Sequence, residues 1–306
     1  MDEDVNFQGG KYGNALQAAS YKGHHAVVEL LLASKADVNA QGGWCGNALQ
    51  AASFNGNLAV VELLLANKAD VNVQGGYYGN ALQAASFNGN LAVVELLLAN
   101  KVDVNVQGGE YGNALQAASV QGNLAVVELL LANKAAVNAQ GGKYGNALQA
   151  ASYNGNLAVV ELLLANKADV NAQGGYRGSA LQAASCIDNH AVVELLLANK
   201  ADVNIQGGYY GNALQAASFN GNLAVVELLL ANKADVNAQG GWLGNALQAA
   251  SFNGNQAVVE LLLANKADVN VQGGEFSNAL QAASVQGNLA VVELLLASSC
   301  GVAAGQ

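Results

Sequence analysis

Side chains that could carry catalysis or bind a metal are few in this chain of 306 residues, and their spacing suits neither task. The histidines are His24, His25 and His190, and the adjacent pair cannot chelate from one helix face because neighbours in a helix point apart. There is no Gly-x-Ser-x-Gly motif and no phosphate loop with its lysine. Asp70, Glu62 and their copies have the pattern of solvated surface charges. The sequence therefore predicts a protein that is not an enzyme and needs no cofactor or metal.

Charge and cysteine usage narrow the setting in which the chain works. Its net charge is −10 and its pI about 4.6, so it repels phosphate backbones and anionic membrane surfaces. Cys45, Cys186 and Cys300 are widely spaced and form no CxxC pair, which fits a reducing compartment. The acidic start has no apolar stretch behind it, and no apolar run approaches the roughly 20 residues of a membrane span. We expect a cytoplasmic protein that binds neither nucleic acid nor membrane.

A repeat of 33 residues runs through almost the whole chain. Such units bury their apolar faces only against their neighbours. We therefore expect a single domain over residues 1–306, with a partial finger over residues 1–12. The nine units start near Gly13, Gly46, Gly79, Gly112, Gly145, Gly178, Gly211, Gly244 and Ser277.

Each unit is expected to contain two helices and a turn-rich finger, as the unit of residues 79–111 illustrates. Asn80 and Gln83 have the spacing of a capping box at the start of the first helix, and Gly89 can end it by adopting a positive φ. Asn90 is then expected to cap the second helix, which has a broad apolar face around Val93, Val94 and Leu96–Leu98. Residues 103–109 read as the finger.

This combination of length, paired helices and Ala-Asp-Val-Asn finger resembles the ankyrin repeat. The resemblance implies an all-α solenoid of nine tandem helix-turn-helix units with β-turn or hairpin fingers. Where that family usually has Thr-Pro-Leu-His, this chain has Asn-Ala-Leu-Gln, as at residues 47–50. Lys68 stands where the family ends its second helix with glycine, so we expect Asn67 to take the left-handed conformation. The wording of the units specifically resembles arrays attached to fungal NACHT-type receptor proteins.

The units differ from one another mainly at two places, the residue pair at the finger tip and the end of the first helix. Of 18 aromatic residues, all but Phe7 lie there, and the resemblance places both on one concave groove. Aromatic side chains are the commonest interface anchors, so a protein or peptide is the expected partner. The helix-end rings could instead pack over neighbouring fingers. The candidate contact residues are Tyr12, Trp44, Tyr77, Tyr78, Tyr111, Tyr144, Tyr176, Arg177, Tyr209, Tyr210, Trp242 and Phe276 at the tips, with Phe54, Phe87, Tyr153, Phe219 and Phe252 at the helix ends.

The sixth unit departs from the pattern. Its first helix ends in Cys186-Ile187-Asp188, where other units have an aromatic residue or valine, a polar residue and glycine. Arg177, the only arginine in the chain, is at the tip of this unit. Two interpretations remain open. Arg177, Cys186 and His190 could form a polar centre, or the unit is simply degenerate.

The two terminal units keep the apolar pattern of internal ones, although solenoids normally close with polar caps. Val27, Val28, Leu30 and Leu31 in the first unit, like the last helix over residues 291–296, should expose apolar surface. Three hypotheses follow. The chain is a binding module, an array that self-associates end to end, or an engineered sequence without a natural ligand.

Overall fold

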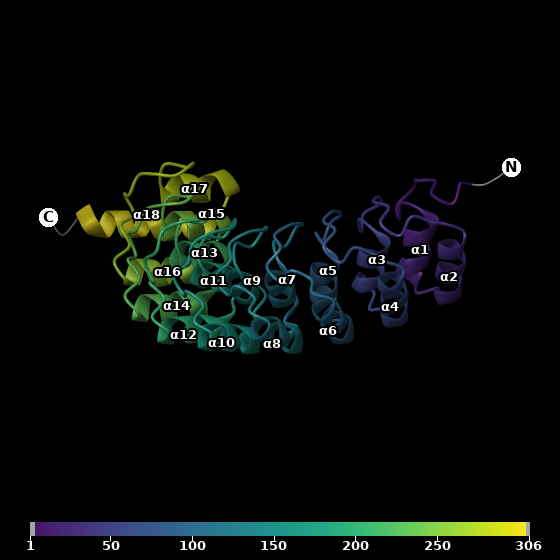
Figure 1. The fold of residues 1–306 in the computed structure, drawn as a ribbon. Coiled ribbons are helices and arrows are strands. Elements are labelled where there is room, and N and C mark those ends of the chain that lie inside the picture. The colour runs from purple at the N-terminus through teal and green to yellow at the C-terminus, as the bar shows by residue number, and fades with distance from the viewer. Residues whose placement is uncertain (1–3, 304–306) are drawn as a thin grey trace. The chain divides into compact units, whose positions relative to one another are not determined.

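The computed structural model describes residues 4–303, which form eighteen helices in nine pairs (Figure 1). The first helices of the pairs are seven or eight residues long, and second helices are nine except for the last. The helices are α1 (Ala15–Lys22), α2 (His25–Ala33), α3 (Ala48–Phe54), α4 (Leu58–Ala66), α5 (Ala81–Asn88), α6 (Leu91–Ala99), α7 (Ala114–Gln121), α8 (Leu124–Ala132), α9 (Ala147–Tyr153), α10 (Leu157–Ala165), α11 (Ala180–Cys186), α12 (His190–Ala198), α13 (Ala213–Asn220), α14 (Leu223–Ala231), α15 (Ala246–Asn253), α16 (Gln256–Ala264), α17 (Ala279–Gln286) and α18 (Leu289–Ala303).

The chain forms two compact units. Unit 1 runs from the N-terminus through Ala147 and includes Ala165–Ala168, while unit 2 comprises Leu148–Leu164 and the chain from Asp169 onwards. Within each unit, first helices of neighbouring repeats pack on one another, and so do second helices. In unit 1 the two sets form separate layers, and the fingers extend from the side of the first helices (Figure 1).

The core lies between these layers. In α6, Val93, Val94 and Leu97 are fully buried, and in α5 Leu82 and the adjacent alanines are buried as well. The small alanines let neighbouring first helices approach closely, as their spacing in the sequence suggests. Within residues 4–303, none of the helices combines the length and apolarity that crossing a membrane requires.

The ends of the first helices follow the prediction. The Asn80 side chain accepts a hydrogen bond from the backbone N–H of Gln83 (2.8 Å), and Gly89 closes the helix with φ 72°. At other first helices, such as α7, the glutamine side chain also accepts a hydrogen bond from the backbone N–H of the capping asparagine, Asn113, which completes the capping box. At Asn80 only the first bond forms, since Gln83 Oε1 has no hydrogen-bond partner within residues 4–303; the reciprocal bond expected of the Asn-Gln pair is therefore made in some repeats and not in this one.

Two predictions about the second helix are wrong. Asn90 precedes α6 but does not cap it; its amide instead donates to Ser53 O (2.9 Å) and Phe54 O (2.8 Å) of the preceding repeat. The left-handed residue is Lys68 (φ 67°), not Asn67. The Asn67 amide donates back to Leu63 O (2.8 Å), which holds Asn67 beside the last turn and moves the reversal one residue on.

The fingers are closed by glycine pairs. Gly75 N donates to Gly79 O (2.7 Å), and the two residues form an isolated antiparallel bridge. Within each unit, neighbouring tips are also tied together, as where Tyr77 N donates to Trp44 O (2.8 Å). Gly76 has φ 64°, and a Cβ there would come within 2.4 Å of the backbone of Cys45. Only glycine therefore allows neighbouring fingers to lie this close.

A buried glutamine clamps the first helix to the finger that follows it. Gln83 Nε2 faces three carbonyl oxygens of the following finger, Val106 O (3.1 Å), Gly108 O (3.2 Å) and Gly112 O (2.6 Å). Sequence reasoning gave Gln83 only its capping role. The clamp explains how a polar side chain that is 2% exposed is tolerated in the core.

Candidate functional site: the finger-tip row

The two residues of each tip pair have different environments. The first residues of the pairs form what we call the tip row: Lys11, Trp44, Tyr77, Glu110 and Lys143 in unit 1, and Tyr176, Tyr209, Trp242 and Glu275 in unit 2. The second residues turn inward, as shown by Cys45 (4% exposed), Tyr78 (7%) and Leu243 (3%). The tip row is therefore the part of the finger that a partner can reach.

The candidate contact residues accordingly fall into three classes of exposure. Tyr78 is buried and cannot offer its ring to a partner, against the sequence-based expectation. Tyr77 (45%), Tyr176 (55%) and Tyr209 (37%) are exposed. The remaining candidates are half-buried: Tyr12, Trp44, Phe54, Phe87, Tyr111, Tyr144, Tyr153, Arg177, Tyr210, Phe219, Trp242, Phe252 and Phe276.

In unit 1 the inward-facing rings form a continuous stack. Tyr78 lies between the helix-end rings of Phe54 (4.7 Å between ring centroids) and Phe87 (5.1 Å), and Phe87 in turn stacks on Tyr111 (4.6 Å). Burial raises the pKa of both tyrosines, and it raises the pKa of the Cys45 thiol to about 12 against a smaller opposing effect of Lys11. These groups stay neutral and act as packing residues.

In unit 2 the stack is interrupted at the sixth repeat, where Cys186 occupies the helix-end position. The guanidinium of Arg177 fills that space, with its Cζ 4.1 Å from the ring centroid of Tyr153 and its Nη2 3.1 Å from the Tyr153 hydroxyl. It also donates to Cys186 Sγ. Burial, with a contribution from Cys186, raises the pKa of Tyr210 to about 12. Arg177 thus replaces the missing ring.

The polar centre considered from the sequence forms only in part. Arg177 and Cys186 meet, but His190 lies on the exposed face of α12, 3.4 Å from Glu194 one turn on. His190 does not join them because it starts the second helix, where its side chain turns toward Glu194. Ile187 (38%) and Asp188, which follow Cys186, are exposed.

Charged side chains of the tip row were missed as site residues by sequence reasoning, which weighed the aromatic ones. Lys143 Nζ is 3.6 Å from Glu110 Oε1, and Lys11 lies over the rings of Tyr12 (5.7 Å) and Trp44 (5.8 Å). The sequence does carry a signal for them. Within the nine tip pairs, lysine and glutamate occur only at the first position, which indicates an exposed residue.

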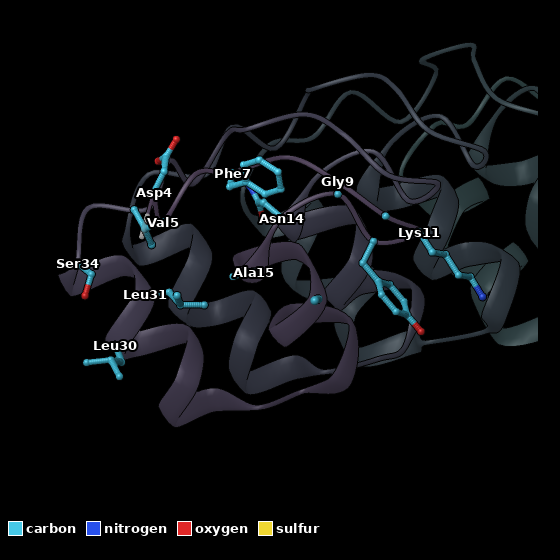
Figure 2. Close-up of a pocket in the computed structure, with 14 residues that line it drawn as sticks. Asp4, Val5, Phe7, Gly9, Lys11, Asn14, Ala15, Leu30, Leu31 and Ser34 are labelled. Atoms are coloured by element: carbon cyan, nitrogen blue, oxygen red, sulfur yellow. The ribbon is translucent and has the colours of Figure 1, made fainter. Parts of the chain in front are cut away.

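A second candidate surface is the N-terminal end of unit 1, where a cavity of about 750 Å³ opens between the first finger and α2. Phe7 and Leu30 contribute to its lining (Figure 2) and are 73% and 67% exposed. In unit 2, Leu289 of the last helix is 68% exposed. Both ends therefore carry exposed apolar side chains, as the sequence predicts, but Val28 (0%) and Val291 (1%), which were expected to contribute, are buried.

Paired helices, glycine-closed fingers and a repeat of 33 residues define a helical repeat protein of the solenoid class. Family models for ankyrin repeats match this chain, one described as "many copies" over residues 16–65 and 56–98, the other as "3 copies" over 81–174, 148–240 and 180–273. The chain belongs to the ankyrin-repeat family, whose members generally serve as protein-interaction modules.

A solved structure supports the fold. The crystal structure of the human ASB11 ankyrin repeat domain is similar to this chain, with 27% sequence identity and a TM-score of 0.61. The likeness covers 71% of this chain and 96% of that one. No curated protein matches the sequence.

Proposed function

We propose that the chain binds a protein or peptide through its tip row. The observation that supports this is the division of each repeat into a nearly invariant frame and a variable tip-row position, which is exposed in six of the nine repeats. Tyr77, Tyr176 and Tyr209 are each more than a third exposed, while the capping and clamping residues beneath them recur almost unchanged from repeat to repeat.

The frame suits recognition because it fixes the tips before a partner arrives. Tip-to-tip hydrogen bonds such as Glu110 N to Tyr77 O (2.9 Å) hold the backbone, and the ring stack beneath limits side-chain motion. Little conformational entropy is therefore lost at the tips when a partner binds. Exposed tyrosines then offer large contact areas with few torsions to freeze.

Further features of the proposal rest on charge and resemblance. With a net charge of −10, the chain is a poor ligand for nucleic acid or anionic membranes, and we place it in the cytoplasm. The resemblance to arrays on fungal NACHT-type receptors suggests that recognition is coupled to signalling by a larger protein. Catalysis has no place in this proposal.

The test compares proteins captured from a cell extract by the intact chain and by the triple variant Tyr77→Ser, Tyr176→Ser, Tyr209→Ser. Trp44 and Trp242 are left unchanged because they belong to the ring stack. The matched control is Leu124→Ser, Leu157→Ser, Leu223→Ser, three exposed apolar residues (36–37%) that begin second helices. The tip variant should lose specific partners while the control keeps them.

The proposal fails if both variants capture what the intact chain captures, or if no chain captures anything. Circular dichroism must show that both variants keep the helix content of the intact chain. An array without a natural ligand, as an engineered sequence would be, corresponds to the second of these results.

End-to-end self-association is the second candidate, and the exposure of Leu30 and Leu289 supports it. At internal repeats the counterpart of Val27 is buried, as Val60 shows (2% exposed against 47%). Light scattering over a range of concentrations tests this. A mass that rises with concentration, and no longer does so in a Leu30→Lys, Leu289→Lys variant, supports assembly; a monomer at all concentrations refutes it.

A further inference from the structure

Charge is distributed unequally between the two units. Unit 1 contains eight basic and eleven acidic residues, whereas unit 2 contains four and eleven, so unit 2 holds −7 of the net charge of −10. The tip rows differ in the same sense. Lys11 and Lys143 belong to the tip row of unit 1, while that of unit 2 has no lysine.

The one basic residue at a tip in unit 2 is already engaged. Arg177 is held by Tyr153 and Cys186 inside the stack and leaves the surface above it without a compensating cation. Glu110 in unit 1 is paired with Lys143 at 3.6 Å. Its counterpart Glu275 is exposed, and none of the ion pairs within residues 4–303 includes it. Unit 2 therefore has an uncompensated carboxylate in its tip row.

This carboxylate adjoins the exposed rings. Tyr209 stacks on Tyr176 (4.9 Å between centroids) and contacts Trp242 (5.5 Å), the residue that precedes Glu275 in the row. Burial and Tyr176 raise the pKa of Tyr209, and the charge of Glu275 adds to the effect. The Tyr209 hydroxyl thus remains neutral and lies within the electrostatic reach of Glu275.

A second carboxylate lies at the sixth repeat. Asp188 is exposed, two residues beyond the Cys186 that Arg177 contacts, and Ile187 beside it is 38% exposed. Other repeats have glycine at the position of Asp188. Glu275 and Asp188 are therefore both exposed carboxylates of unit 2, which has no basic residue in its tip row.

We infer that the tip row of unit 2 binds a basic segment of the partner, one in which arginine or lysine side chains lie against Tyr176 and Tyr209 and near Glu275. This deepens the proposed function and rests on it. Aromatic rings attract cations, arginine most readily by stacking, and a carboxylate adds a charge-assisted hydrogen bond. An acidic segment would meet repulsion from the same groups, and a purely apolar one would leave Glu275 without a partner.

The probe is a fluorescein-labelled peptide of alternating glycine and arginine, with its glycine–glutamate counterpart as a negative control. Fluorescence anisotropy with the full chain at physiological salt should show binding of the arginine peptide only. Tyr176→Ser with Tyr209→Ser should weaken binding about tenfold, as two exposed cation–π contacts would. The exposed substitution Glu275→Gln, which leaves the core untouched, should weaken it about threefold.

Two substitutions in unit 1 provide the matched controls. Tyr77→Ser removes an equally exposed tyrosine (45%) and Glu110→Gln an equivalent glutamate; each should change the affinity less than about twofold. Equal losses from either unit would show general attraction to an acidic protein and would overturn the inference, as would unchanged binding by the unit 2 variants.

The two proposals can fail separately. If the arginine peptide does not bind but the triple tyrosine variant still loses partners from extract, binding through the tip row is supported and the inference of a basic segment is refuted. Should extract capture also be unaffected by the tip substitutions, both are wrong.

Discussion

The two units share one backbone frame but differ in what fills the space beneath their tips. In unit 1, rings follow one another from Tyr12 to Tyr144 without a break. In unit 2, Cys186 interrupts the helix-end rings and Arg177 occupies the gap. The tip rows differ in parallel, with lysines in the first and none in the second.

What the two units keep in common identifies what holds the repeats together. Gln83 in unit 1 and Gln215 in unit 2 each donate to three carbonyls of the following finger. Their geometry is nearly identical although the rings above them are not. The glutamine clamps are therefore the constant contact between a first helix and its finger, whereas the aromatic stack tolerates the replacement of a ring.

The largest effect is expected from breaking a clamp. Gln83→Ala and Gln215→Ala each remove the side-chain donor that bonds three carbonyl oxygens and leave a cavity in its place, and should cost about 2–4 kcal/mol of unfolding free energy. Urea denaturation followed by circular dichroism measures this. Gln281→Ala is the control, because Gln281 is exposed and should cost less than about 0.5 kcal/mol. If Gln83→Ala and Gln281→Ala cost the same, the clamp does not hold the junction.

The next effect concerns the interruption in unit 2. Arg177→Tyr together with Cys186→Phe would give the sixth repeat the ring pair that Tyr78 and Phe87 form in unit 1. We expect each single substitution to destabilise the chain, since one overfills the site and the other removes the partner of Cys186. The double variant should recover about 1–2 kcal/mol relative to the sum of the singles. Additive single effects in a double-mutant cycle would contradict the assigned contact.

Much of the frame could be predicted from the sequence because its signals are local. The Asn80–Gln83 spacing identifies a helix start and Gly89 a helix end, and both are confirmed. The roles of Asn90 and of the Gln83 side-chain amide could not be predicted, since their acceptors are distant in the sequence, 36 or 37 residues away for Asn90 and 23 to 29 for Gln83. A side chain with both donor and acceptor capacity does not reveal its long-range partner in one sequence.

The candidate site was predicted only as a region. Variation located the tips, but it did not show that Tyr77 points outward while Tyr78 is buried, because two tyrosines in sequence look alike. Comparison of repeats carries the missing signal. The first position accepts lysine and glutamate, whereas the second accepts cysteine and leucine, which is the pattern of an exposed residue followed by a buried one.

Alkaline pH should distinguish the two units through Cys45, whose counterpart in unit 2 is Leu243. The folded-state pKa of Cys45 is raised from 9.0 to about 12 by burial, so the folded chain holds this proton after the unfolded chain has lost it. Its contribution is complete below pH 9 and is lost as pH rises towards 12, by at most about 1.4 kcal/mol per pH unit. Cys45→Leu should reduce the fall in melting temperature between pH 9 and 10, a fall to which the tyrosines contribute in both proteins. An unchanged slope would mean that the thiol is not buried in solution.

The smallest effect is expected at the turn of the sixth repeat. Asp188 has φ 59° where other repeats have glycine, and a residue with a Cβ is strained there. A Cβ at the counterpart Gly221 would come within 2.9 Å of the Asn255 side chain. The Nδ2 of that side chain donates to Ser218 O and Phe219 O. Asp188→Gly should therefore stabilise the chain by about 0.5–1 kcal/mol, and Gly221→Asp should destabilise it by at least as much. Because Asp188 also adds an exposed carboxylate to the sixth repeat, Asp188→Gly should at the same time weaken binding of the arginine peptide. A gain in stability with undiminished binding would remove Asp188 from the recognition surface and leave Glu275 as its anionic group.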